Sequence, residues 1–228
     1  MANKQVSLTV KAFCTLGTTL IAASAGAAKR SGFIVEAHDS ASAAAAVRQV
    51  GGRVTRDLPI IDGVASQLTT AQATRLRKST HLSLFPDAGA TPQGGPDAWN
   101  MPVMGVPQLH AQGINGTGVT VAVIDTGVGN AQGIAPWAKL VWVRAFGANG
   151  AGSYSNVIAG MNWILTHKAQ YNIRVLNLSF GAPPQSYYWN DPINQAAMKL
   201  WQAGIVVVAS AGNSGPAEQT ISVPGNTP

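Results

Sequence analysis

Apolar runs and helical patterns alternate along the second half of the chain. Hydrophobic runs at 119–124, 140–144, 175–179 and 205–210 predict buried strands. Two helical patterns, at 155–169 and 192–203, lie among them. Strands that alternate with helices in this way predict a parallel sheet with both faces covered. We therefore expect an α/β domain over 91–228.

The first half has another order of elements. Strands are expected at 32–36, 53–61, 64–68 and 81–85, and helices at 40–50 and 69–77. Asp62-Gly63 is typical of a two-residue hairpin turn, and Thr69 with Gln72 has the spacing of a capping box. Pro59 has no N–H to donate, which predicts an edge position or a bulge. The β-α-β-β-α-β order predicts a ferredoxin-like α+β unit.

Residues 1–27 have the pattern of an export signal. Lys4 and Lys11 supply positive charge, an apolar run follows at 12–23, and small residues suitable for cleavage end the segment. The alternative is a membrane anchor, but the run is shorter than the ~20 residues that a span requires. We therefore expect a signal peptide and a secreted, extracellular protein. Cys14 is the only cysteine, so the processed chain would have neither a disulfide nor a thiol nucleophile.

Composition narrows the choice of partners. The chain is 46% hydrophobic and only 11% charged, which is typical of a compact protein. Its net charge of +6 comes mostly from the first 90 residues. Because 91–228 is nearly neutral, no basic stripe predicts nucleic-acid binding. Residues 89–100 are rich in Gly and Pro, which predicts a linker and a plausible cleavage point.

Three segments carry candidate chemistry. The strand 119–124 leads into Asp125-Thr126-Gly127, and open α/β sheets place their sites at such carboxyl ends. The strand 205–210 leads into Ala211-Gly212-Asn213, and the strand 175–179 into Phe180-Gly181. Taken one at a time, these segments could be a capped turn, a surface turn and a core strand.

Together the three segments resemble the subtilisin-like serine peptidases, or subtilases. The resemblance implies a partial subtilisin-like parallel-sheet domain over 91–228, preceded by an inhibitory propeptide over 28–90. It implies peptide-bond hydrolysis by Asp-His-Ser acyl transfer, with Asp125 orienting the histidine and Asn213 donating to the oxyanion. The substrate-binding residues that it implies are Ser179, Phe180, Gly181, Ala211 and Gly212.

The same resemblance implies the partners. These would be a peptide or protein substrate, and the chain's own propeptide or a related peptidase. No organic cofactor is implied. Subtilases often bind calcium, but no dense carboxylate cluster in the sequence identifies a site.

Two expected motifs are missing from this sequence. Subtilases carry His-Gly-Thr-His after the aspartate, and a later Gly-Thr-Ser-Met-Ala motif carries their nucleophilic serine. The four histidines, at positions 38, 81, 110 and 167, lie in other contexts. Residues 133–140 resemble the segment that normally follows the histidine helix, which indicates an internal deletion. We therefore expect an incomplete and inactive peptidase.

Two alternatives remain open at this point. A non-catalytic inhibitor could bind a complete peptidase through residues 32–88. A nucleotide-binding protein could use Gly127, Gly129 and Gly133, although Pro136 breaks the helix that a dinucleotide fingerprint needs.

Overall fold

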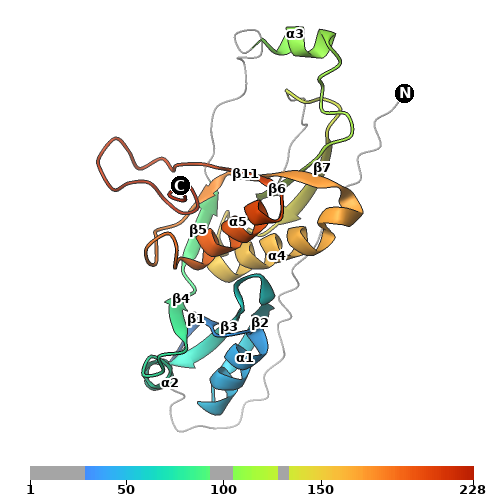
Figure 1. The fold of residues 1–228 in the computed structure, drawn as a ribbon. Coiled ribbons are helices and arrows are strands. Elements are labelled where there is room, and N and C mark those ends of the chain that lie inside the picture. The colour runs from blue at the N-terminus through green and yellow to red at the C-terminus, as the bar shows by residue number, and fades with distance from the viewer. Residues whose placement is uncertain (1–28, 93–104, 128–133) are drawn as a thin grey trace.

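The computed structural model describes residues 29–92, 105–127 and 134–228 (Figure 1). The expected signal peptide and two of the three glycines of the nucleotide-binding alternative lie outside these residues. Within them, no helix is both long and apolar enough to cross a membrane.

The N-terminal unit has the predicted β-α-β-β-α-β order. Its antiparallel sheet has the strand order β2-β3-β1-β4, and both helices pack on one face of it. The bounds are β1 Arg30–Glu36, α1 Ser40–Gln49, β2 Arg53–Leu58, β3 Gly63–Thr69, α2 Thr70–Leu76 and β4 Ser83–Pro86. Strand alternation gives each face its own core: Val35 and Val64 lie under the helices, whereas Ile34 and Ala65 belong to the main core on the other side.

The connection between β2 and β3 differs from the prediction. The strand ends at Leu58, and Pro59–Ile61 forms a 3-10 turn, η1. Asp62 follows in the left-handed region, with φ of 54°, so Asp62-Gly63 is not a two-residue hairpin turn. Proline fixes its own φ near the helical value, which favours a helical turn over a continued strand. The capping box is confirmed, because Gln72 N donates to Thr69 Oγ1 and Thr69 N donates to Gln72 Oε1.

The C-terminal unit is built on a four-stranded parallel sheet in the order β11-β9-β6-β7. Its strands are β6 Thr120–Asp125, β7 Lys139–Arg144, β9 Ile173–Leu178 and β11 Val206–Ala209. Helices α4 Tyr154–Tyr171 and α5 Pro192–Gln202 lie between this sheet and the N-terminal unit (Figure 1). The remaining helix, α3 Val106–Ala111, was not predicted and is short.

Only one face of the parallel sheet is covered by helices in the described part of the chain. Ala122 and Ile124 of β6 are fully buried, and the latter contacts α4 at Gly160. Val206 and Val208 of the outermost strand β11 are about half exposed. The expectation of two covered faces is therefore not met within the described residues, and the described parts of the β6–β7 connection contain no helix.

Candidate functional site

A short strand from the end of the N-terminal unit lies in a groove of the C-terminal unit. Strand β5, Gly89–Pro92, pairs antiparallel with β10, Phe180–Gly181, on one side and with β8, Gly152–Ser153, on the other. Thr91 lies opposite Gly181, and Ala90 lies opposite Gly152. An extended segment paired along both edges is the geometry of strand addition.

This strand corrects the prediction that 89–100 begins as a linker. Its composition is that of a loop, but Ala90 is only 1% exposed and both strand edges find partners. Tertiary pairing therefore overrides the local preference of Gly and Pro. The remaining predicted linker residues lie outside the described residues, apart from Thr91 and Pro92 at the end of β5.

Aromatic packing fixes the walls of the groove. Phe180 is fully buried and its ring centroid lies 5.6 Å from that of Phe146. On the opposite wall, a Cβ at Gly152 would come within 2.6 Å of Cδ1 of the same Phe146 ring. Glycine is thus required where β8 meets this ring. One phenylalanine therefore supports both β8 and β10.

The residues before β5 bind the start of α4. Tyr154 N donates to the carbonyl oxygen of Ala88 at 3.0 Å. Asp87 accepts from Ser155 N at 2.9 Å and from Ser155 Oγ at 2.7 Å. The first amides of a helix have no intrahelical partner, and a carboxylate at that end also interacts favourably with the helix dipole. Ser153 is the N-cap residue of α4 and accepts from Asn156 N, so Asp87 adds a second cap from the other unit at Ser155 N.

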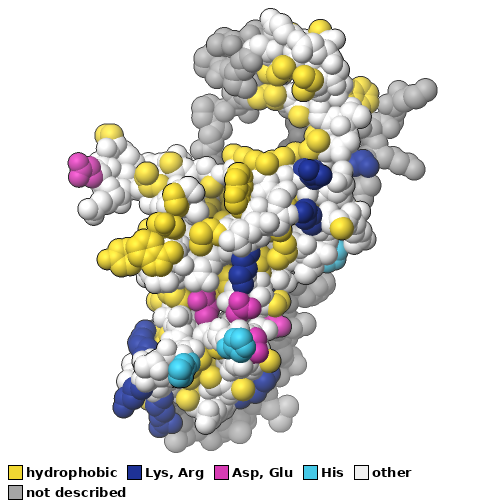
Figure 2. Space-filling model, viewed as in Figure 1, with side chains coloured by type: hydrophobic (Ala, Val, Ile, Leu, Met, Phe, Trp, Pro, Cys, Tyr) yellow, Lys and Arg dark blue, Asp and Glu magenta, His cyan; other side chains and the backbone are white. Residues whose placement is uncertain are grey.

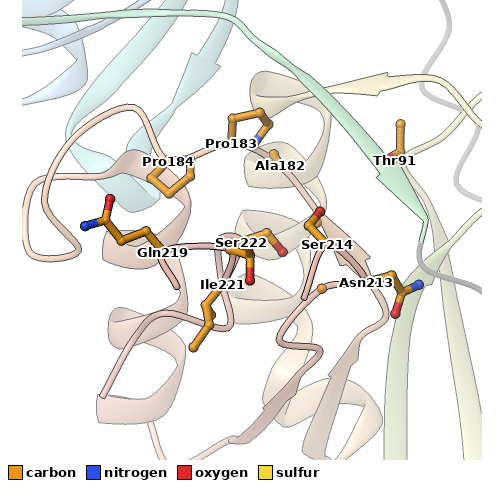
Figure 3. A pocket seen from close by; sticks show the side chains of 12 residues that line it. Thr91, Ala182, Pro183, Pro184, Asn213, Ser214, Gln219, Ile221 and Ser222 are labelled. Carbon is orange, nitrogen blue, oxygen red and sulfur yellow. The ribbon is translucent and has the colours of Figure 1, made fainter. Parts of the chain in front are cut away.

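A pocket of about 390 Å³ opens beside β5. Figure 3 shows Thr91 of β5 at its rim, with Asn213, Ser214 and Ser222 on the walls. The twelve described residues that line it carry no charge: Thr91, Gly181, Ala182, Pro183, Pro184, Gly212, Asn213, Ser214, Gln219, Thr220, Ile221 and Ser222. Such a lining suits an uncharged side chain.

The structure brings three of the residues implied by the resemblance into this pocket. Gly181, Gly212 and Asn213 all line it. The Phe180 side chain is in the core, so only its backbone faces β5. Ser179 lies half-buried, and its Oγ accepts from Asn177 Nδ2 at 2.8 Å.

Ala211 lies just outside the lining. Its carbonyl oxygen accepts from Ser222 N at 3.0 Å and so ties two walls of the pocket together. None of these six positions has a tested role, and each remains a prediction.

Asp125 ends β6, as predicted, and is half-buried. Its Oδ1 accepts from Thr126 N at 2.6 Å and from Thr126 Oγ1 at 3.2 Å. No hydrogen bond within the described part of the chain joins it to a histidine. His110 Nε2 instead lies 2.8 Å from the carbonyl oxygen of Ile134, and His167 stacks on Trp163.

Comparison with known proteins identifies the family that the C-terminal unit resembles. Residues 129–228 match the model of the subtilase family. Those residues are subtilase sequence. The match begins just after Asp125 and includes β7, β9, β11 and the whole pocket wall around Asn213. The predicted family resemblance is thereby confirmed.

Individual relatives extend the subtilase likeness toward the N-terminus. The serine protease AprX of Bacillus subtilis is 29% identical over 170 residues, 51% of this chain and 38% of that protein. An alkaline protease of Shouchella clausii is 26% identical over 223 residues, 79% of this chain and 57% of that protein. The chain thus spans only 38% and 57% of the lengths of these two relatives.

A solved structure shares the fold. Fervidolysin of Fervidobacterium pennivorans, a keratinolytic enzyme related to subtilisin, superimposes with a TM-score of 0.65 at 20% identity. The match covers 82% of this chain and 40% of fervidolysin. Its coverage of this chain extends beyond the part that the family model matches.

Metal ligands do not gather in the described residues. No group of three or more His, Cys, Asp or Glu side chains there could hold a metal ion. Calcium binding therefore stays an expectation from the resemblance alone, and no chemical step is assigned to it.

Sequence reasoning missed Asp87, Ser155 and Glu36. The first two form the cap on α4, and the third is buried where the units meet. Their importance arises from contacts between segments far apart in the chain. No local pattern in the sequence could have identified them.

Proposed function

We propose that the protein is the precursor form of a secreted, subtilisin-like serine endopeptidase, with residues 28–90 as its propeptide. The observation that carries the proposal is β5, which lies between β8 and β10 as an extended substrate would. In this arrangement the propeptide's last residues occupy the groove and exclude other peptides.

The groove supports binding of extended protein segments by strand addition. The backbone of Phe180 and Gly181 would pair with the substrate, and the uncharged pocket beside Thr91 would accept an uncharged side chain. The side-chain amide of Asn213, which is exposed on the pocket wall, would donate to the oxyanion. Asp125 would orient a catalytic histidine.

Residues 1–228 lack the histidine and serine motifs, so they supply neither a general base nor an activated nucleophile. We therefore expect this stretch of chain to bind peptides without cleaving them. Purified protein should neither digest casein nor react with a fluorophosphonate probe. Stoichiometric labelling by that probe would contradict the expected inactivity.

Displacing β5 tests whether the groove binds extended peptides. Ala90 is only 1% exposed, so Ala90→Arg should expel the strand because a guanidinium cannot be buried there unpaired. A fluorescent peptide with the sequence of residues 87–92 should then bind Ala90→Arg and not the parent. Ala45→Arg makes the same substitution at an exposed position of α1 and serves as the control. Equal binding by Ala90→Arg and the parent, or by a reversed-sequence peptide, would overturn the proposal.

The second candidate is an inhibitor that acts through the propeptide-like unit. It is favoured by the hydrogen bonds that Asp87 and Ala88 make to the start of helix α4. Inhibition of a complete subtilase by Ala90→Arg would argue against it, because that variant cannot place residue 90 in a groove. Inhibition by the parent alone would favour it.

A further inference from the structure

One carboxyl group is buried where the two units meet. Glu36 ends β1 and is only 8% exposed. Its Oε1 has no hydrogen-bond partner among the described residues, and its Oε2 accepts only a long bond, 3.5 Å, from Gln195 Nε2 of α5. A carboxylate accepts several hydrogen bonds when it is stably charged. This site offers Glu36 one weak bond.

The neighbouring charges do not neutralise Glu36. Lys199 of α5 is already paired with Asp62, at 2.8 Å between Nζ and Oδ2. Asp191, the N-cap of α5, is fully buried and adds negative charge. The residues opposite Glu36 in the sheet, Gly63 on β3 and Ser83 on β4, carry no charge. Figure 2 shows acidic and basic side chains gathered at this junction of the units.

Burial is the main cause of the resulting shift. Burial, with smaller contributions from the charges of Asp191 and Asp62, raises the pKa of Glu36 from 4.5 to about 8. The hydrogen bond from Gln195 and the charge of Lys199 oppose the rise without cancelling it. The docked arrangement therefore selects the protonated carboxyl group.

We propose that Glu36 is a pH-responsive latch between the N-terminal unit and α5, which holds the units together while protonated and releases them as it ionises in water. Helix α5 packs over the Glu36 carboxyl group, so undocking of the units exposes that group to water. Because only Asp87 and Ala88 separate β4 from β5, movement of the unit would withdraw β5 from the groove. The inference rests on the proposed function, since it concerns how the occupied groove is vacated.

The direction of the effect follows from linkage. Docking raises the pKa, so the latch holds fully below about 4.5, where both states are protonated. Between about 4.5 and about 8 the docking equilibrium should fall about tenfold per pH unit. Above about 8 Glu36 is ionised in both states, and the equilibrium should become constant. Rising pH therefore favours an open groove.

The first test measures the ionisation in the full chain. The sequence contains only two glutamates, Glu36 and Glu218, so carboxyl-labelled glutamate gives two signals in a carbon-13 NMR titration. Glu36→Gln removes one signal and assigns both. A Glu36 midpoint several pH units above 4.5 is expected. A midpoint near 4.5 in the docked protein would overturn the latch.

The second test measures docking by amide hydrogen exchange between pH 5 and pH 8. The Tyr154 amide begins α4 and has its partner, Ala88 O, in the other unit, so its protection reports docking. Protection should fall by about tenfold per pH unit in the parent and stay constant in Glu36→Gln. Asp57→Asn, at an exposed acid of the same unit, should behave as the parent.

The possible outcomes separate the two proposals. If Tyr154 is unprotected even at pH 5, β5 does not hold the groove and the proposed function fails. If it is protected but insensitive to pH, or equally sensitive in Glu36→Gln, only the latch fails. If core amides such as those of Ile34 and Leu176 lose protection in parallel, ionisation unfolds the chain and the latch is again overturned.

Discussion

Replacing Asp87 by alanine should weaken the docking of the two units without unfolding either. The Asp87 carboxylate accepts two hydrogen bonds from Ser155 and caps α4. Hydrogen bonds to charged groups contribute about 1.5–3 kcal/mol each, and loss of a helix cap costs about 0.5–2 kcal/mol.

The hydrogen-bond and capping energies cannot be added, because the bond from the Ser155 amide to Asp87 is counted in both. Asp87 is moreover only half-buried, and Ser153 Oγ, 3.0 Å from Ser155 Oγ, can replace one partner. We therefore expect a loss of about 2–3 kcal/mol, which weakens docking roughly 30- to 150-fold at about 1.4 kcal/mol per factor of ten.

The assay is amide exchange at Tyr154 in the full chain at pH 5, where Glu36 is protonated. Ser155→Ala is the matched control, because it removes the hydroxyl bond and keeps the amide bond. Its loss should be about 1 kcal/mol, and Asp87→Asn should fall between the two. A change below threefold in Asp87→Ala would refute the reasoning. Equal loss at the Leu176 amide would refute it as well.

Two further predictions concern the packing beside the pocket and the edge of the parallel sheet. Gly225→Ala should destabilise the chain by more than about 2 kcal/mol in urea unfolding, because its Cβ would lie 2.8 Å from Ala211 Cα and nearer still to Ser210 O. Gly215→Ala, with no atom nearer than 3.9 Å, should cost much less, and equal losses would contradict this account. Lysines at Val206 and Val208, both about half exposed on β11, should reduce self-association in light scattering, because charge on an outer strand opposes edge-to-edge pairing. Lysines at the exposed Gln49 and Gln202 control for added charge, and equal effects of the two pairs would count against the edge as the cause.

The central elements could be predicted because their patterns are strong and local. The strands β6, β7, β9 and β11 and the helices α4 and α5 lie within about two residues of the predicted bounds. The capping box of α2 needed only Thr69 and Gln72. Each of these features depends on residues close together in the sequence.

The misses share a cause, which is dependence on distant partners. The loop-like composition of 89–92 gave no sign that β8 and β10 would pair with it. Burial of Glu36 is produced by α5, which lies more than 150 residues further along the chain. The site was only partly predictable for the same reason: motifs located Asp125 and Asn213, but neither motif could reveal that Thr91 completes the pocket wall.

The two-residue connection between β4 and β5 determines how well a free peptide can compete with β5 for the groove. Asp87 N donates to Gly32 O, and Ala88 O accepts from Tyr154 N, so both connecting residues are held in place. A segment tethered this closely has an effective concentration in the millimolar range. A free peptide of equal intrinsic affinity would have to reach a similar concentration to share the groove. Cutting the chain after β5 would leave this advantage intact, whereas cutting between β4 and β5 would abolish it.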